Sequence, residues 1–154
     1  MPRGVGVAVS VVALLAVGCS RGPKAPPPPP APAACGPQAV AVEAIDVERD
    51  GVTSFRVVGE GCSLTRPVGV RAVLDRLLFV GVPQSTQTLP MLDQPDVYRT
   101  QPPKELRQLR DEGWAQFVVS VMPLDTGAYT VRYDLSGLRR WLERNRLARK
   151  FGLP

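Results

Sequence analysis

The chain of 154 residues has no histidine, few lysines and only three cysteines, which narrows the chemistry open to it. Without histidine, neither a Ser–His nor a Cys–His pair can activate a nucleophile. None of the three lysines, Lys24, Lys104 and Lys150, is spaced from a serine in a way that suggests a Ser–Lys dyad. Carboxylate pairs such as Asp111 and Glu112 occur in polar, loop-like settings, where solvated charge is the default, and a glycosidase-like pair stays open. We therefore predict a protein that is not an enzyme and has no catalytic residues.

The scarcity of ligand residues also argues against bound cofactors. Zinc sites use cysteine and histidine at close, regular spacing, and no two cysteines here have that spacing. A Gly-x-Gly motif at Gly59–Gly61 is a weak phosphate-loop signal, because the rest of a nucleotide fingerprint is absent. We predict no metal site, no cofactor, no nucleic-acid partner and no small-molecule substrate.

The N-terminus has the pattern of a secretory signal peptide. Arg3 precedes an uncharged, mostly apolar run that ends at Val17, and this run is shorter than the roughly 20 residues that cross a bilayer. The next residues complete the sequence Ala16–Cys19, which resembles the lipobox of bacterial lipoproteins. The resemblance implies cleavage before Cys19, a diacylglyceryl group on its sulfur and acylation of the new amine. Three acyl chains give a stable anchor; an ordinary signal peptide with an incidental cysteine is the alternative.

The residue after the lipobox bears on the destination of the protein. Ser20 follows Cys19, where an aspartate would favour retention in the inner membrane of Gram-negative bacteria. The resemblance therefore implies a protein anchored by its N-terminal lipid in the outer membrane and facing the periplasm.

A proline-rich segment separates this signal from the rest of the chain. It includes an unbroken run from Pro26 to Pro30, and proline has a fixed φ and no amide donor. We expect a semi-rigid polyproline II spacer that reaches up to ~50 Å at about 3.1 Å per residue; a ligand for a proline-reading domain is the alternative. The predicted organisation is a signal peptide over residues 1–18, a lipidated cysteine with its tether over 19–37 and a globular domain over 38–154.

Two cysteines remain after lipidation of Cys19. An even number of cysteines in an exported protein favours a disulfide, here between Cys35 and Cys62. It would close a loop of about 27 residues and stabilise the fold by roughly 3 kcal/mol. Two independent thiols, with Cys62 buried, are the alternative.

The hydrophobic pattern of the domain predicts an α+β fold. The simplest packing is two-layered, with a four-stranded, mostly antiparallel sheet and helices on one face, in the order β-β-α, α, β-β-α. In the first strand, the alternation of apolar and polar residues changes phase at Ile45, which indicates either a bulge or a strand end buried on both faces. The connection from Gly81 to Pro103 is expected to lack regular structure and either to pack on the core or to form a partner surface. Strands are predicted at 38–48, 52–58, 114–122 and 128–133, and helices at about 63–80, 103–112 and from 134 onwards.

The basic charge gathers at the end of the chain. The last predicted helix has an apolar stripe, which we expect to pack on the sheet, and an arginine-rich opposite side. Such a helix can bind anionic lipid headgroups or peptidoglycan; a solvated face that compensates the helix dipole is the alternative. The candidate binding residues are Arg139, Arg140, Arg144 and Arg146, and Arg149 and Lys150 follow them.

Two stretches of the domain carry a family resemblance. A strand, Gly-Glu-Gly and a helix ending in Leu77–Pro83, with the later run Leu138–Glu143 before Phe-Gly, resemble small lipoproteins of unassigned role from bacterial envelopes. The tether and the small domain are also similar, in architecture alone, to outer-membrane lipoproteins that activate penicillin-binding proteins. We predict a non-catalytic binding, scaffold or accessory module of a periplasmic protein machine, with an envelope protein or peptidoglycan as partner. A cell-wall or anionic-lipid surface binder acting through the basic helix is the alternative.

Overall fold

The computed structural model describes residues 28–47, 50–124 and 127–148. Met1–Pro30 and Ala31–Pro154 are separate units, and the description below concerns the second. The predicted signal peptide, Cys19 and the first part of the tether lie outside the described residues, as do Arg149, Lys150 and the final Phe-Gly.

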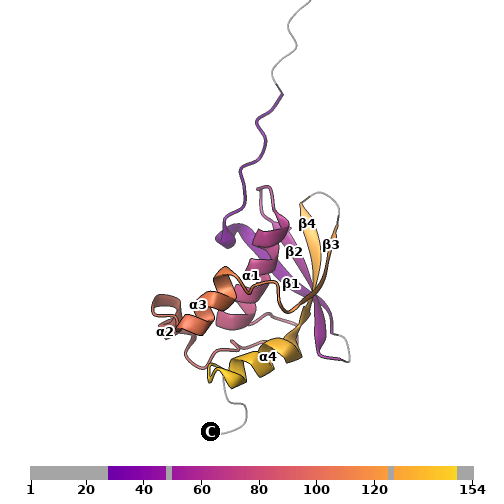
Figure 1. Ribbon diagram of the computed structural model, residues 1–154. Coiled ribbons are helices and arrows are strands. Elements are labelled where there is room, and N and C mark those ends of the chain that lie inside the picture. Colours follow the sequence, from indigo (N-terminus) through magenta and orange to yellow (C-terminus); the bar gives the residue numbers. More distant parts are fainter. Residues whose placement is uncertain (1–27, 48–49, 125–126, 149–154) are drawn as a thin grey trace, which may run out of the picture. The chain divides into compact units, whose positions relative to one another are not determined.

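The predicted α+β fold is confirmed (Figure 1). The described residues form one open sheet of four strands in the order β1-β2-β4-β3, and every pairing in it is antiparallel. The elements in chain order are a 3-10 turn (Pro37–Ala39), β1 (Val40–Val47), β2 (Val52–Gly59), α1 (Arg66–Phe79), α2 (Pro95–Thr100), α3 (Lys104–Asp111), β3 (Val118–Pro123), β4 (Ala128–Asp134) and α4 (Leu135–Arg144).

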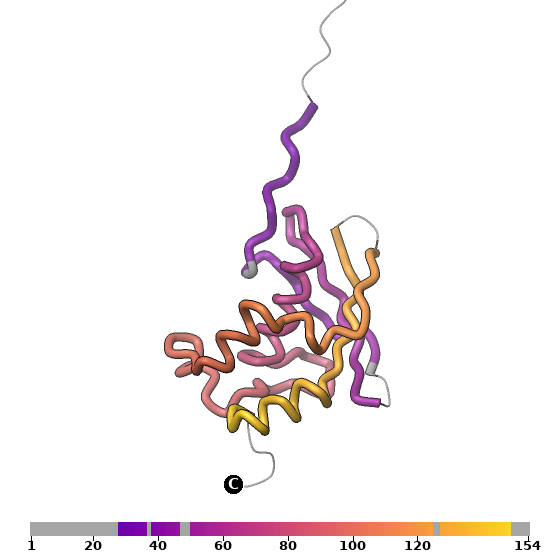
Figure 2. The backbone as a smooth tube through the Cα atoms, in the orientation of Figure 1, coloured from indigo at the N-terminus to yellow at the C-terminus, as the bar shows by residue number. Residues whose placement is uncertain are grey.

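The helices gather on one side of the strands, as predicted (Figure 2). Alternate residues of the central strands, among them Phe55, Val57 and Tyr133, are fully buried and share one apolar core with α1, α3 and α4. Leu138 and Leu142 of α4 belong to the same core, so the predicted apolar stripe packs inward. Burial of this stripe turns the polar side of α4 toward solvent.

The two hairpins have the same plan, because β2 and β4 pair at the centre while β1 and β3 form the edges. The register between β1 and β2 shifts between Ala44 and Asp46, and Ile45 is 55% exposed. Of the two alternatives for Ile45, the bulge is therefore confirmed. The register between β3 and β4 shifts in a similar way between Val118 and Ser120.

The third strand begins later than predicted, at Val118 rather than at position 114. The amides of Gln116 and Val118 donate to the carbonyls of Gly113 and Ala115, both at 3.0 Å, so residues 113–117 fold as turns. Trp114 is apolar but half-buried beneath a side chain of α1 rather than paired in the sheet. The prediction of a strand at these residues rested on their apolar and aromatic composition alone.

The connection from Gly81 to Pro103 contains regular structure, contrary to the prediction, because α2 lies within it. None of the side chains of α2 is buried, so the sequence has no periodic apolar pattern that would predict this helix. The connection also completes the core: Met91 and Leu92 are buried, and their amides donate to the carbonyls of Leu77 and Leu78 at 3.0 and 3.3 Å. These bonds satisfy carbonyls in the last turn of α1.

The predicted pair of cysteines lies at disulfide distance, with the sulfurs of Cys35 and Cys62 2.12 Å apart and the Cα atoms 5.0 Å apart. Beside it, Ala34 and Ser63 form a parallel bridge, and the amide of Cys35 donates to the carbonyl of Ser63 at 3.0 Å. The residues before β1 are thereby fastened to the connection between β2 and α1.

Candidate functional site

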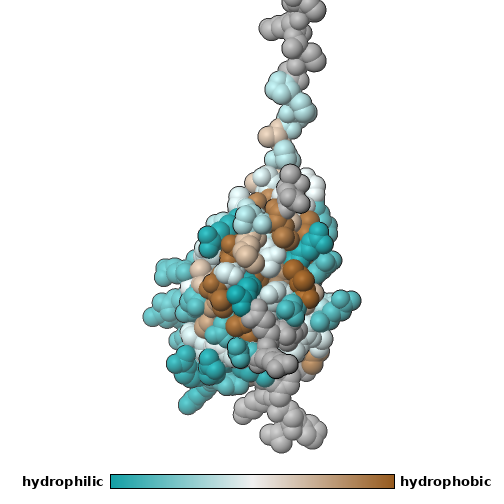
Figure 3. All heavy atoms as spheres, turned by 90° about the vertical axis from the view of Figure 1, so that its right-hand side faces the viewer, coloured by the Kyte–Doolittle hydropathy of each residue, from teal (hydrophilic) through white to brown (hydrophobic). Residues whose placement is uncertain are grey.

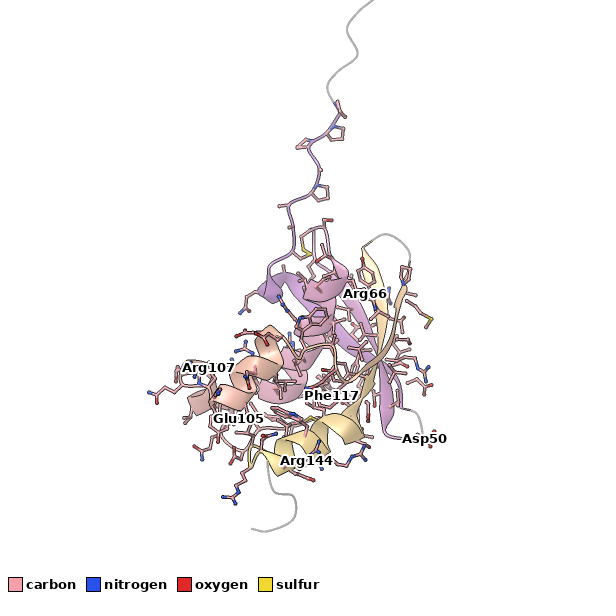
Figure 4. The ribbon with its side chains drawn as sticks, viewed as in Figure 1. Asp50, Arg66, Glu105, Arg107, Phe117 and Arg144 are labelled. Atoms are coloured by element: carbon pink, nitrogen blue, oxygen red, sulfur yellow. A yellow bond between two sulfur atoms is a disulfide. The ribbon has the colours of Figure 1, made fainter. Side chains whose placement is uncertain are left out.

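The arginines predicted as a binding surface lie on α4 and just after it. Arg140, Arg144 and Arg146 are exposed, whereas Arg139 is half-buried; Figure 4 shows Arg144 on α4. Arg140 and Arg144 are one turn apart and therefore share a helix face. Arg146 follows the end of the helix with a φ of 58°. The structure thus exposes three of the four predicted side chains, two of them on α4 and one just after it.

A second group of arginines, which the sequence did not single out, surrounds the C-terminal half of α1. Here a surface depression of about 300 Å³ lies between α1, α2, α3 and the start of β1. The lining residues are Gln38, Val40, Ala72, Asp75, Arg76, Phe79, Val80, Arg99 and Arg110. We call this the Phe79 hollow.

Two guanidinium groups in the Phe79 hollow contact the ring of Phe79. The Cζ atoms of Arg99 and Arg110 lie 5.4 and 5.2 Å from the ring centroid, within the range of cation–π attraction. The Nη2 of Arg99 also donates to the carbonyl oxygen of Phe79 at 3.3 Å. Because Phe79 is the last residue of α1, these contacts place positive charge at the negative end of the helix dipole.

The carboxylate in the hollow already has a partner. Asp75 accepts hydrogen bonds from the Nε of Arg110 at 2.9 Å and from its Nη2 at 3.3 Å. This bidentate arrangement suits the planar guanidinium. Both side chains are about one-third exposed, so the pair stabilises the fold by at most about 1 kcal/mol. Its consequence for the hollow is that the carboxylate is neutralised, while two further arginines line the same space.

Arg76 differs from the other arginines of the hollow. Its side chain is exposed, and none of the described residues forms a hydrogen bond or ion pair with it. It is therefore a cation at a concave site whose donors are available to an incoming group. This is the arrangement expected for binding an anion.

A neighbouring hollow of about 350 Å³ shares Asp75 and Arg110 with the first. Arg71 lines it and lies over the ring of Trp114, with 5.2 Å between its Cζ and the ring centroid. Its Nη2 also donates to the carbonyl oxygen of Asp111 at 3.3 Å. Trp114, which lies outside the sheet, thus contacts α1 through Arg71.

The side of the molecule with β3 and β4 carries a different surface, on which apolar and hydrophilic side chains alternate (Figure 3). Val119, Met122 and Leu124 are each 43–51% exposed along the edge formed by β3. The bulge next to Val119 and the proline at position 123 are features that discourage an edge strand from pairing with another chain. This edge is accordingly a weaker candidate than the Phe79 hollow.

The described part of the chain offers no cluster suited to metal binding. Within it, no group of three or more Cys, Asp or Glu side chains could hold a metal ion, and no helix is long and apolar enough to cross a membrane. Burial raises the pKa of Tyr133, whose hydroxyl donates to the carbonyl of Trp114 at 3.3 Å. That side chain is fully enclosed in the core and is therefore structural.

Comparison with protein-family models, with curated proteins and with solved structures gives no match to this chain. The candidate site is therefore supported by its own geometry.

Sequence reasoning missed the Phe79 hollow because its walls come from elements far apart in the chain. Asp75 and Arg76 looked like the solvated face of α1, and 35 residues separate Asp75 from Arg110. Arg99 lies on α2, a helix that the sequence pattern did not predict. The available signal was a pair of charged residues beside the last apolar turn of α1, which is common in solvated helices.

Proposed function

We propose that the protein is a lipid-anchored, non-catalytic binding module that engages an acidic protein partner from the periplasmic face of the outer membrane. The lipobox resemblance at Ala16–Cys19 supports the anchor, and the proline-rich segment supports a spacer that lets the domain reach its partner. The role of the domain is that of a binding or accessory component in an envelope machine.

The observation that carries the proposal is the surplus of positive charge in the Phe79 hollow. Three arginines and one aspartate line it, and the aspartate is already paired with Arg110. Arg76 has its donors available, and a charge-assisted hydrogen bond is about twice as strong as a neutral one. An acidic group of a partner therefore finds both a concave surface and a cation there.

Capture of partners from detergent-solubilised envelopes by the full-length protein tests this function. We expect a saturable protein partner that is retained by Arg66→Glu and lost with Arg76→Glu. Arg66 is a matched control, because it is an exposed arginine of the same helix, about 15 Å along the axis from Arg76 (Figure 4). Absence of any saturable partner, or equal loss with both variants, would contradict the proposal.

The anchor is tested separately by Cys19→Ala. Loss of the acylated sulfur leaves no lipid to hold the chain, so we expect the protein to move from the membrane to the soluble periplasmic fraction. Continued retention in the membrane after a high-salt wash would contradict lipid anchoring.

The second candidate function is binding to the cell wall or to an anionic lipid surface through α4. It is favoured by the exposure of Arg140 and Arg144 on the side of α4 that faces away from the core, and by the exposure of Arg146 just after the helix. Cosedimentation with peptidoglycan or with vesicles containing anionic lipid separates the two functions. Salt-sensitive binding that is lost with Arg140→Glu and Arg144→Glu, and kept with Arg76→Glu, would favour this second function.

A further inference from the structure

The Phe79 hollow combines two surfaces that suit different parts of one ligand. Its apolar lining consists of Val40, Ala72, Phe79 and Val80; the first three are only 4–8% exposed, so Val80, at 44%, supplies most of the accessible apolar surface. Its cationic lining is Arg76 and Arg99, since Arg110 is engaged by Asp75. A free phosphate would gain nothing from the apolar lining, whereas a carboxylate attached to an aliphatic group gains from both surfaces.

The donors in the hollow match a carboxylate in geometry. A guanidinium is planar and presents its N–H groups as a fork that fits the two oxygens of a carboxylate. Arg76 has this fork available, and Arg99 uses one Nη2 bond to the Phe79 carbonyl while its other donors remain. Gln38, at the rim, has an amide that can both donate and accept, as a peptide group requires.

The size of the hollow favours the end of a chain over its middle. About 300 Å³ lies at the lower limit of ligand sites and admits one or two residues. A chain end places its charge and its last side chain on the same residue, so a single residue can reach both linings. An internal acidic residue would need room for the chain on both sides.

We propose that the Phe79 hollow binds the C-terminal carboxylate of a protein whose last residue is aliphatic. Arg76 and Arg99 hold the carboxylate, the side chain of that residue contacts Val80, and Gln38 bonds the preceding peptide group. This inference deepens the proposed function, because it names the group of the partner that the hollow takes.

Titration of the full-length protein in detergent with a fluorescent peptide ending in Gly-Ala-Val tests the proposal. The same peptide with a C-terminal amide is the matched control ligand. We expect the free acid to bind at least about tenfold more tightly than the amide, in a salt-sensitive way. Arg76→Gln should weaken binding of the acid about tenfold, whereas Arg66→Gln should leave it unchanged. Thermal unfolding of each variant checks that the fold is retained.

Several results would overturn the inference. Equal affinity for acid and amide, equal effects of Arg76→Gln and Arg66→Gln, or complete competition by millimolar inorganic phosphate would each contradict it. Tighter binding of a peptide ending in D-alanine would identify cell-wall stem peptides, and not a protein, as the source of the carboxylate. If the acid fails to bind while partner capture still depends on Arg76, this inference fails and the proposed function stands.

Discussion

At the scale of single residues, arginine has two roles in this domain. Arg71 and Arg99 each lie over an aromatic ring and donate to a backbone carbonyl, which fixes their guanidinium groups in place. A guanidinium suits both contacts, because its plane can stack on a ring while the N–H groups at its edge donate. Arg76 and Arg144, by contrast, have donors without a described partner and extend into solvent. The fixed arginines shape the surface, Arg99 among them with donors left for a ligand, and the solvent-exposed arginines are available for recognition.

Tyr133 gives a prediction with a pH dependence. Tyr133→Phe removes the hydrogen bond to the Trp114 carbonyl and should lower the free energy of unfolding by about 1 kcal/mol near pH 7. Burial raises the pKa of Tyr133 above its ordinary value of 10.0, so the unfolded chain loses this proton at a lower pH than the folded protein does. The contribution of Tyr133 is therefore fully present below pH 10 and declines as the pH rises above 10. Denaturant titrations at pH 7 to 11 measure the difference in free energy of unfolding between the wild type and Tyr133→Phe. A difference that stays constant above pH 10 would contradict the prediction.

Gly81 is required by both backbone conformation and space. Its φ is +90°, and a Cβ there would meet the carbonyl group of Thr88. Gly81→Ala should therefore lower the free energy of unfolding by at least about 2 kcal/mol. Gly127→Ala is the matched control, because Gly127 has a φ of +84° with nothing within 4 Å of the added methyl. Strain alone predicts a loss of about 1 kcal/mol for that variant. Equal losses measured by urea denaturation would show that the contact with Thr88 is unimportant.

At the scale of elements, the start of α4 depends on one side chain. The Oδ1 of Asp134 accepts from the amide of Gly137 at 2.7 Å, so Asp134, rather than Ser136, caps the helix. Asp134→Ala should lower the free energy of unfolding by about 1 kcal/mol. Ser136→Ala, which removes the other residue able to cap this helix, should change it by less than about 0.5 kcal/mol. Circular dichroism during thermal unfolding compares the two, and a larger loss for Ser136→Ala would contradict this assignment.

Elements in which apolar residues recur at a regular spacing were predictable from the sequence. Elements held in place by a few individual contacts were not. Val70, Val73 and Leu77 recur at helical spacing and lie in the core, so α1 followed from its pattern. Trp114 and Phe117 favoured a longer third strand by composition, but hydrogen bonds within residues 113–118 turn the chain instead. Only Pro95 and Asp96 marked the start of α2, because that helix buries no side chain.

The same reasoning explains how much of the candidate site was predictable. Arg140 and Arg144 follow the helical period of α4, so their exposure was expected from the burial of Leu138 and Leu142. The Phe79 hollow depends on tertiary contacts between α1, α2 and α3, including the ion pair of Asp75 with Arg110. A pattern read along one element contains no information on such contacts.

At the scale of the whole molecule, the pair of Cys35 and Cys62 fastens the residues before β1 to the domain. Replacement of both cysteines by alanine should lower the free energy of unfolding by about 3 kcal/mol, since the closed loop spans 27 residues. Urea denaturation under oxidising conditions measures this loss. Addition of a reductant should lower the stability of the wild type by a similar amount and leave the double variant unchanged. Equal stability of all four samples would show that the pair contributes nothing.

The central claim is that a partner docks at the Phe79 hollow, and site-specific crosslinking in cells tests it most directly. A benzophenone amino acid is placed at Val80, on the rim of the hollow, or at Ile45, in the bulge of β1; these side chains are 44% and 55% exposed. We predict that position 80 gives a saturable protein adduct that disappears with Arg76→Glu, and that position 45 gives none. No adduct from position 80, or the same adduct from both positions, would contradict the claim.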